Sequence, residues 1–224
     1  MLGRFARRTA LAGAVAYGVY SAGIRPWKHR WDASPDERRA ILPGDDLVPT
    51  PTAVETRAIT VGAPPSAVWP WLVQMGHGRA GWYSYDRLDR DGQRAWRLNP
   101  QFEDLTLGAM VPTHPHGGFK VVGLEHECVL VLYMDATLAQ ERASLPEFSV
   151  SWTFVLQPLP SSKTRLIERV RTSIPEGGVG HLAFQRVTGF GIFLMQRKQL
   201  LGIKARAERT WRAQVQEPVE SHIA

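Results

Sequence analysis

The fold is decided by residues 148–174, which read FSVSWTFVLQPLPSSKTRLIERVRTSI. Over 148–156 apolar residues alternate with Ser and Thr, and after a turn at 158–162 a second alternating run covers 164–174. A period of two is typical of strands whose two faces meet different surroundings. The second strand carries Leu166, Glu168, Val170 and Ile174 on one face and Arg165, Arg169 and Arg171 on the other. The apolar face is predicted to point inward.

The elements on either side of this strand pair predict the rest of the domain. A β-rich run covers 54–62, PPS at 64–66 starts a helix over 67–75, and Ser84 starts a short helical turn. Further strands are expected at 107–112, 119–124 and 128–134, and one long helix at 181–212. Strands that are bunched between helices, rather than alternating with them, indicate an α+β fold with an antiparallel sheet.

The chain divides into four segments. Residues 1–24 form an anchor-like or signal-like helix, 25–53 a proline-rich linker, 54–212 the folded domain and 213–224 a flexible tail. Five prolines prevent any long helix in the linker, although SPDE at 34–37 can cap a short one. Residues 40–224 are therefore expected to be soluble and folded without the rest.

The N-terminal segment predicts a membrane association. An uncharged stretch of sixteen residues, 9–24, lies between Arg4, Arg7 and Arg8 on one side and Arg25, Lys28 and Arg30 on the other. It is shorter than the roughly 20 residues that span a bilayer comfortably. Three interpretations stay open: an uncleaved anchor, which is favoured, an export signal, and an amphipathic surface helix.

Small residues recur every fourth position within that stretch, at Ala10, Ala14, Gly18 and Ala22. Such spacing lets two membrane helices approach closely, so a homodimer through this face is an open alternative.

Charge and cysteine content exclude several classes of protein. Residues 1–39 carry eight Lys and Arg against three Asp and Glu, whereas residues 40–180 carry twelve against fifteen. The basic excess therefore lies at the ends of the chain, and no recognition motif for nucleic acid accompanies it, so no nucleic-acid partner is expected. The single cysteine, Cys128, excludes an internal disulfide.

Five short motifs carry a family resemblance: LPGD at 42–45, APPSAVW at 63–69, VQMG at 73–76, GRAGWYSYD at 78–86 and KQLLGIK at 198–204. With the order of elements, they resemble an uncharacterised bacterial branch of the START-like (SRPBCC) superfamily over residues 42–212. The resemblance implies a helix-grip fold, in which a curved antiparallel sheet wraps around a long C-terminal helix and an apolar cavity lies between them. Members bind lipids, polyketides, sterols or plant hormones, and some are cyclases or aromatases, so function must be argued from the site.

Glu168 is the most informative candidate residue. It is a carboxyl on an otherwise apolar strand face, where its pKa should rise unless a partner compensates. It could orient a ligand hydroxyl or act as a general acid or base. The alternatives are a one-residue error in the strand register, and a structural ion pair with an arginine such as Arg97.

Aromatic residues are expected to form walls of the ligand site, since such sites are mostly apolar. These candidates are Trp82, Tyr83, Trp96 and Trp152. On the long helix, Val187, Phe190, Leu194 and Leu201 follow helical spacing and are expected to close the cavity, with Leu194 contacting the ligand. The helix cations Arg197, Lys204, Arg206 and Arg212 are expected to remain mostly in water.

No metal or cofactor is expected. His114 and His116 lack a third ligand, and the GxGxxG string at 76–81 follows a helix rather than a strand. The favoured function is a membrane-tethered module that binds or transfers an apolar small molecule, such as a lipid or polyketide. A cyclase or dehydratase using Glu168, and a tethered interaction domain without a ligand, are the alternatives.

Overall fold

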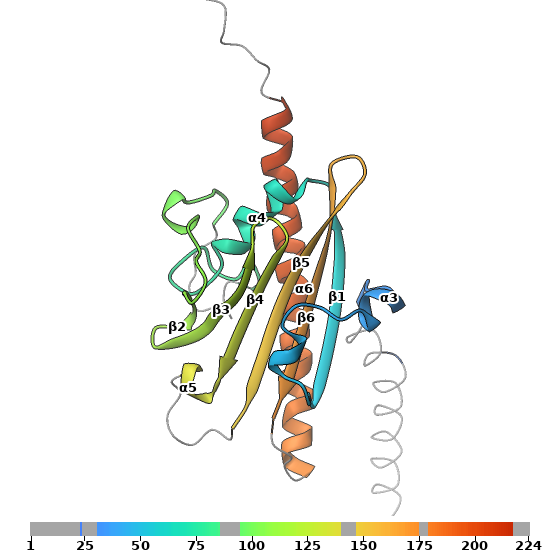
Figure 1. Ribbon diagram of the computed structural model, residues 1–224, viewed down its shortest axis with the longest axis vertical. Coiled ribbons are helices and arrows are strands. Elements are labelled where there is room, and N and C mark those ends of the chain that lie inside the picture. Colours follow the sequence, from blue (N-terminus) through green and yellow to red (C-terminus); the bar gives the residue numbers. More distant parts are fainter. Residues whose placement is uncertain (1–22, 24–30, 86–94, 140–146, 175–178, 217–224) are drawn as a thin grey trace, which may run out of the picture.

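The computed structural model describes residue 23 and residues 31–85, 95–139, 147–174 and 179–216; for 179–188 it describes the backbone alone. One antiparallel sheet has the strand order β1-β6-β5-β4-β3-β2, and a long helix packs against it (Figure 1). The strands are β1 Ala53–Val61, β2 Met110–His114, β3 Gly117–Glu125, β4 Val129–Asp135, β5 Ser149–Leu159 and β6 Lys163–Ser173. The helices are α3 Pro35–Arg39, α4 Pro65–Val73, α5 Ala136–Ala139 and α6 Val179–Gln216, with single 3-10 turns at η2 Asp45–Leu47 and η3 Pro100–Phe102.

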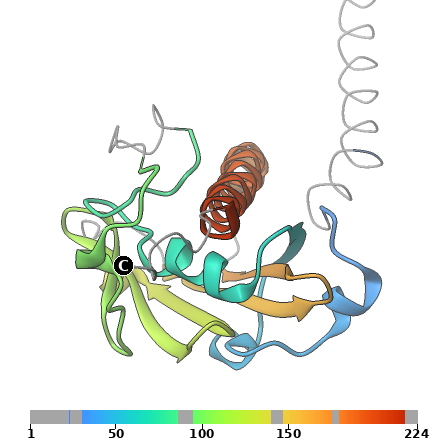
Figure 2. The ribbon, with the colours of Figure 1, turned by 90° about the horizontal axis from the view of Figure 1, so that it is seen from above.

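The first strand of the chain pairs with the last one. β1 is antiparallel to β6, with Arg57 opposite Glu168, and β6 pairs with β5 along its whole length. Seen from above, α4 and α6 lie on the same side of the curved sheet (Figure 2). The α+β helix-grip architecture expected from the sequence is therefore confirmed.

The main core fills the space between the sheet and these two helices. Its wholly buried side chains include Trp71, Leu72, Leu130, Leu132, Phe154, Leu166, Phe193, Leu200 and Ile203. On α6 the buried apolar face runs through Phe193, Leu200, Ile203 and Ala207, while Leu194 and Leu201 are only half-buried. The predicted stripe through Phe190, Leu194 and Leu201 is thus displaced around the helix, and the Val187 side chain lies outside the described residues.

The segment predicted as a linker covers the other face of the sheet from residue 31 onward. Arg169 of β6 is almost completely buried beneath it and donates to the carbonyls of Glu37, Arg38 and Ala40 and to the Asp45 carboxylate. These carbonyls belong to the last turn of α3, which has no intrahelical donors for them. A cation is well placed at this helix end because of the helix dipole.

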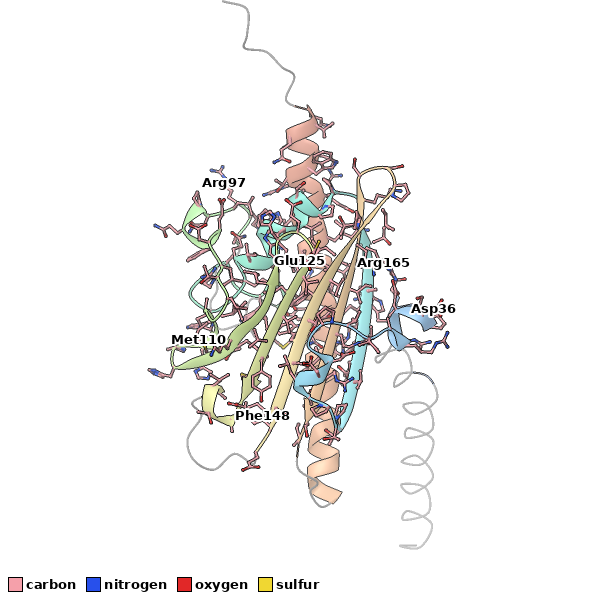
Figure 3. All side chains as sticks on the ribbon, in the orientation of Figure 1. Asp36, Arg97, Met110, Glu125, Phe148 and Arg165 are labelled. Atoms are coloured by element: carbon pink, nitrogen blue, oxygen red, sulfur yellow. The ribbon has the colours of Figure 1, made fainter. Side chains whose placement is uncertain are left out.

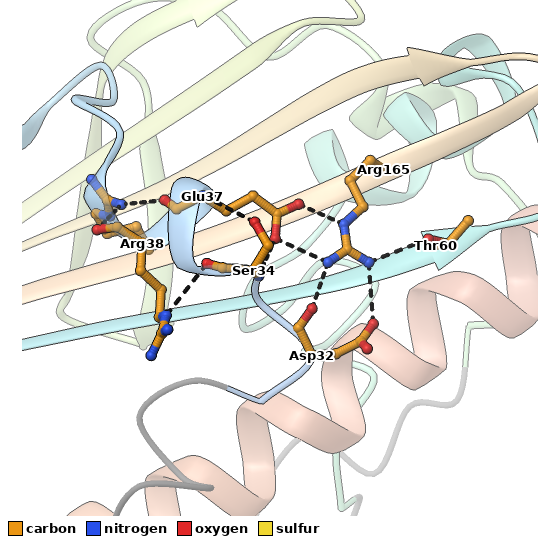
Figure 4. Close-up of polar contacts among 7 residues, drawn as sticks. Asp32, Ser34, Glu37, Arg38, Thr60 and Arg165 are labelled. Carbon is orange, nitrogen blue, oxygen red and sulfur yellow. Dashed lines mark hydrogen bonds and ion pairs between the residues drawn. The ribbon is translucent and has the colours of Figure 1, made fainter.

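Arg165 makes a second attachment to the same segment. Its guanidinium bonds both oxygens of Glu37, at 2.7 and 3.0 Å, and also reaches Asp32 and Thr60 (Figure 4). Ser34 and Glu37 form a reciprocal capping box, so the helix start holds the carboxylate toward Arg165. Further along β6, Arg171 donates to the Val48 carbonyl. We refer to residues 31–52 as the strap.

The outer edge of β1 is closed by side chains and by the strap. Ala58 N donates to the Trp31 carbonyl, Lys204 of α6 donates to the Thr60 carbonyl, and Gly62 N donates to Glu208. An edge strand with these groups unpaired would be open to pairing with another chain. At its C-terminal end, α6 continues to Gln216, into the segment predicted as a tail.

Candidate functional site

Glu168 lies in the main core, between the sheet and α6. Its side chain has no exposed surface, and its Oε1 accepts a 2.7 Å hydrogen bond from Trp152 Nε1 of the neighbouring strand. Its Oε2 has no hydrogen-bond partner among the described residues. Buried polar atoms are nearly always bonded, so this oxygen requires an explanation.

Arg57 of β1 is the charged neighbour of Glu168. It is equally buried, and its Nη1 lies 3.9 Å from Glu168 Oε2, too far for a hydrogen bond. Its Nη2 bonds the carboxylate of Glu55, and the guanidinium lies 5.4 Å from the centroid of the Phe193 ring on α6. Within the described part of the chain, Nε and Nη1 find no acceptor. The predicted partner, Arg97, lies on the far side of the molecule from β1 (Figure 3).

Burial raises the pKa of Glu168, because the ionised carboxylate loses the solvation of water. The positive charge of Arg57 and the hydrogen bond from Trp152 oppose this rise in the pKa, and the nearby Glu55 carboxylate adds to it. The group is therefore poised to exchange a proton nearer to neutral pH than an exposed glutamate would.

This shift predicts a pH-dependent stability. A folded-state pKa above the ordinary value of 4.5 means that the folded chain binds the proton more tightly than the unfolded chain does. The stabilisation is fully present below pH 4.5 and is lost as the pH rises through the folded pKa. In urea unfolding at several pH values, the wild type should gain stability relative to Glu168→Gln as the pH falls toward 4.5. The exposed Glu103→Gln serves as control, and a pH-independent difference between wild type and Glu168→Gln would contradict the prediction.

Aromatic rings pack around Trp152, the hydrogen-bond partner of Glu168. Trp82 stacks on Trp152 with centroids 5.5 Å apart and an interplanar angle of 18°. Phe119 and Phe154 contact the same Trp152 ring, with centroids at 5.4 and 5.2 Å. The structure thus brings together Trp82, Trp152 and Glu168, three of the residues predicted for the ligand site.

Tyr83 and Trp96 belong to a different cluster. The Tyr83 hydroxyl accepts from Gln74 Nε2 at 2.9 Å, and burial raises the pKa of Tyr83. The Arg206 guanidinium lies 4.5 Å from the Tyr83 ring and 4.3 Å from the Trp96 ring. Arg206 is buried rather than in water, which corrects the sequence-based expectation, because its long side chain joins α6 to the segment around Ala95.

Two close packing features mark this second cluster. Tyr83 has a positive φ of 57°, and a Cβ at Gly202 would lie 2.5 Å from the Tyr83 carbonyl oxygen. Trp96 is 43 % exposed, and Leu194 is half-buried. None of the described contacts connects Tyr83, Trp96 or Leu194 to Glu168, so their predicted role in binding stays a prediction.

The glycine string at 76–81 forms a tight turn. Gly76 and Gly81 pair with each other, and the backbone N–H groups of His77, Arg79 and Ala80 are used by carbonyls of the protein. A phosphate-binding loop needs such N–H groups to be free, so this turn does not have the geometry of a nucleotide-binding loop.

The two histidines lie at the β2–β3 turn. His114 Nε2 lies 3.0 Å from the Ala139 carbonyl, and its Nδ1 accepts from His116 N. The described residues include no group of three or more His, Cys, Asp or Glu that could hold a metal ion.

The sequence also contains a pattern that marks Arg57 as a candidate site residue. Arg57 shares a strand face with Ile59 and Val61, so it is a charge on an apolar face, as Glu168 is. What the sequence could not provide was the β1–β6 register, which places the two charges opposite each other.

The chain matches no protein-family model and no curated protein. Its fold is similar to a Helicobacter pylori hypothetical protein, with 12 % identity and a TM-score of 0.46 over 75 % of this chain and 95 % of that one. A Mesorhizobium loti protein shares 16 % identity with a TM-score of 0.41, covering 70 % and 98 %. An aromatase/cyclase from Streptomyces shares 12 % identity with a TM-score of 0.36, covering 72 % and 97 %. All three TM-scores lie below 0.5, so these similarities carry no argument about function, which has to be argued from the site.

Proposed function

We propose that this domain binds an apolar small molecule between the sheet and α6, with the polar end of the molecule against Arg57 and Glu168. One observation carries the proposal: two fully buried charged groups face each other with hydrogen-bonding atoms left unused on both. Leaving such atoms unpaired costs about 1 to 3 kcal/mol each, and more for charged groups. A bound molecule with a polar group would remove this cost.

The aromatic surroundings support an apolar body for the ligand. Trp82 is half-buried and stacks on Trp152, so a molecule that approaches Glu168 along this side meets flat apolar surfaces. Ligand sites of this kind combine an apolar lining with a small number of placed polar groups.

Binding is tested by native mass spectrometry of the full chain purified from its own host. We expect a co-purified small molecule on the wild type, and on Arg57→Met or Glu168→Gln an occupancy lower by about tenfold, since each change removes one hydrogen bond to a charged group. The exposed Arg97 provides the matched control, Arg97→Met, which should retain the molecule. Wild type without any bound molecule, together with no tryptophan fluorescence response to apolar probes, would favour an interaction domain without a ligand.

A second function is favoured by the raised pKa of Glu168. A carboxyl whose pKa is raised by burial can act as a general acid in a dehydration or in a cyclisation that expels water, with Arg57 next to the developing negative charge. In that case the molecule recovered from the wild type would be lighter, by one water, than the molecule recovered from Glu168→Gln. Identical masses would exclude a reaction that expels water.

We further propose that the domain is tethered to a membrane through residues 1–24, as the uncharged stretch between basic flanks indicates. Within the described residues no helix has both the length and the apolar character to cross a bilayer, and apart from Gly23 the proposed tether lies outside them. The same is true of Ala10, Ala14, Gly18 and Ala22, so the homodimer also remains a proposal.

Cell fractionation tests the tether. The full chain should sediment with membranes at its intact mass, whereas a chain that begins at residue 31 should stay in the supernatant. A mature protein that starts near residue 23 would identify an export signal instead.

A further inference from the structure

The unused atoms of Arg57 and Glu168 define the shape of the group that fits between them. Arg57 Nη1 and Glu168 Oε2 are 3.9 Å apart, and both lack a hydrogen-bond partner among the described residues. An oxygen about 2.8 Å from each, the usual hydrogen-bond length, forms a triangle on this base with an angle close to 90° at the oxygen. One small group can therefore bond both residues once the surrounding side chains make room for it, since neither Arg57 nor Glu168 has accessible surface in the structure.

The charges around this position decide which group is tolerated. Two carboxylates, Glu55 and Glu168, accompany the single guanidinium of Arg57. Glu55 already occupies Nη2 of Arg57. A carboxylate brought by a ligand would be the third negative charge next to one positive charge, and like charges in a desolvated site repel each other strongly. An ammonium group would instead lie against the guanidinium.

We propose that the polar end of the ligand is an uncharged hydroxyl group, which accepts from Arg57 Nη1 and donates to Glu168 Oε2, and that the site rejects molecules ending in a carboxylate. This inference rests on the proposed function and names the class of its ligand. A hydroxyl is both a donor and an acceptor, so it satisfies two charged groups of opposite sign at once. A ketone accepts only, and would leave Glu168 Oε2 unbonded when the carboxyl is ionised.

Protonation of Glu168 removes the disadvantage of a ketone but leaves the hydroxyl able to bond both residues. The carboxyl then donates through Oε2, and the hydroxyl accepts that bond instead. Burial is the main cause of the raised pKa of Glu168, and the Glu55 carboxylate adds to the rise. The hydroxyl is thus compatible with both protonation states, whereas an anionic group is compatible with one at most.

The test uses two matched pairs of probes on the purified full chain: 1-decanol with decanoate, and 2-naphthol with 2-naphthoate. Affinities are measured by calorimetry at neutral pH, where both alcohols are uncharged. We expect each hydroxyl compound to bind at least about tenfold more tightly than its carboxylate partner. Equal affinities within both pairs, or tighter binding of the carboxylates, would overturn the inference and leave the proposed function standing. If none of the four probes binds, the inference is overturned, and the proposed function falls with it only if the wild type also carries no co-purified molecule.

Two variants test whether the number of negative charges near Arg57 determines the preference for a hydroxyl over a carboxylate. Glu55→Gln removes one negative charge from a residue that is only partly buried, so carboxylate binding should increase several-fold while hydroxyl binding is retained. Glu103→Gln, on the exposed surface, should change neither affinity. Thermal unfolding of each variant shows whether it is folded. Selectivity that Glu55→Gln leaves unchanged in a folded protein would show that the charge count does not determine it, against the inference.

Discussion

A chain that begins at residue 40 is expected to lose about 3 to 5 kcal/mol of folding free energy, whereas a chain that begins at residue 31 keeps it. Removing 31–39 takes away two of the acceptors of the buried Arg169, the carbonyls of Glu37 and Arg38. It also takes away the Glu37 and Asp32 carboxylates that pair with Arg165. Since a domain is typically stable by only about 5 to 15 kcal/mol, the shorter chain should be marginal.

Urea unfolding of the two chains, 31–224 and 40–224, measures the difference directly. In the longer chain Arg169→Met should reproduce most of the loss, because the carbonyls of Glu37, Arg38 and Ala40 then lose their common donor. Arg39→Met is the matched control, since Arg39 makes only an exposed pair with Asp36, of a kind that contributes about 0 to 1 kcal/mol. Equal unfolding midpoints for 31–224 and 40–224 would show that residues 31–39 behave as a linker despite their contacts with Arg165 and Arg169.

The strap shows where local sequence patterns fail. Its prolines exclude a long helix, and that part of the prediction is right, since only α3 and η2 form. The error lies in equating the absence of periodic structure with the absence of packing. What holds the strap is a set of long-range bonds from Arg165, Arg169 and Arg171, and no spacing rule predicts which carbonyls an arginine will reach. For the same reason, the alternation on β6 does not predict that the strap covers the strand face that carries Arg165, Arg169 and Arg171.

The elements with strong local periodicity are predicted more successfully. The alternation over 148–174 corresponds to β5 and β6, and the burial of Glu168 follows from its place on the apolar face of β6. A strand has only two faces, so a period of two leaves little room for error. The inward face of α6 is predicted less accurately, because the buried residue is Phe193 and not the predicted Leu194. Partners such as Arg57 depend on strand register between distant parts of the chain, which the sequence does not specify.

The second large effect concerns the buried pair itself. Arg57→Met should cost about 3 to 5 kcal/mol, because it leaves Glu168 buried without its counter-charge. Glu168→Leu should cost less, because Arg57 still pairs with Glu55. The double variant Arg57→Met/Glu168→Leu should recover most of the loss, since apolar side chains of similar volume often replace a buried ion pair with no net cost. The four unfolding free energies form a double-mutant cycle.

The cycle separates a structural role for the pair from a role in binding. If the pair serves the ligand, the double variant is folded and stable but binds 1-decanol and 2-naphthol at least about tenfold more weakly than the wild type. If the pair serves the fold, the double variant is as unstable as the single ones. A stable double variant that binds both hydroxyl probes with wild-type affinity would place the ligand elsewhere. A ligand hydroxyl gives both Arg57 Nη1 and Glu168 Oε2 the hydrogen bond that each lacks among the described residues, so stability without binding is the outcome we expect.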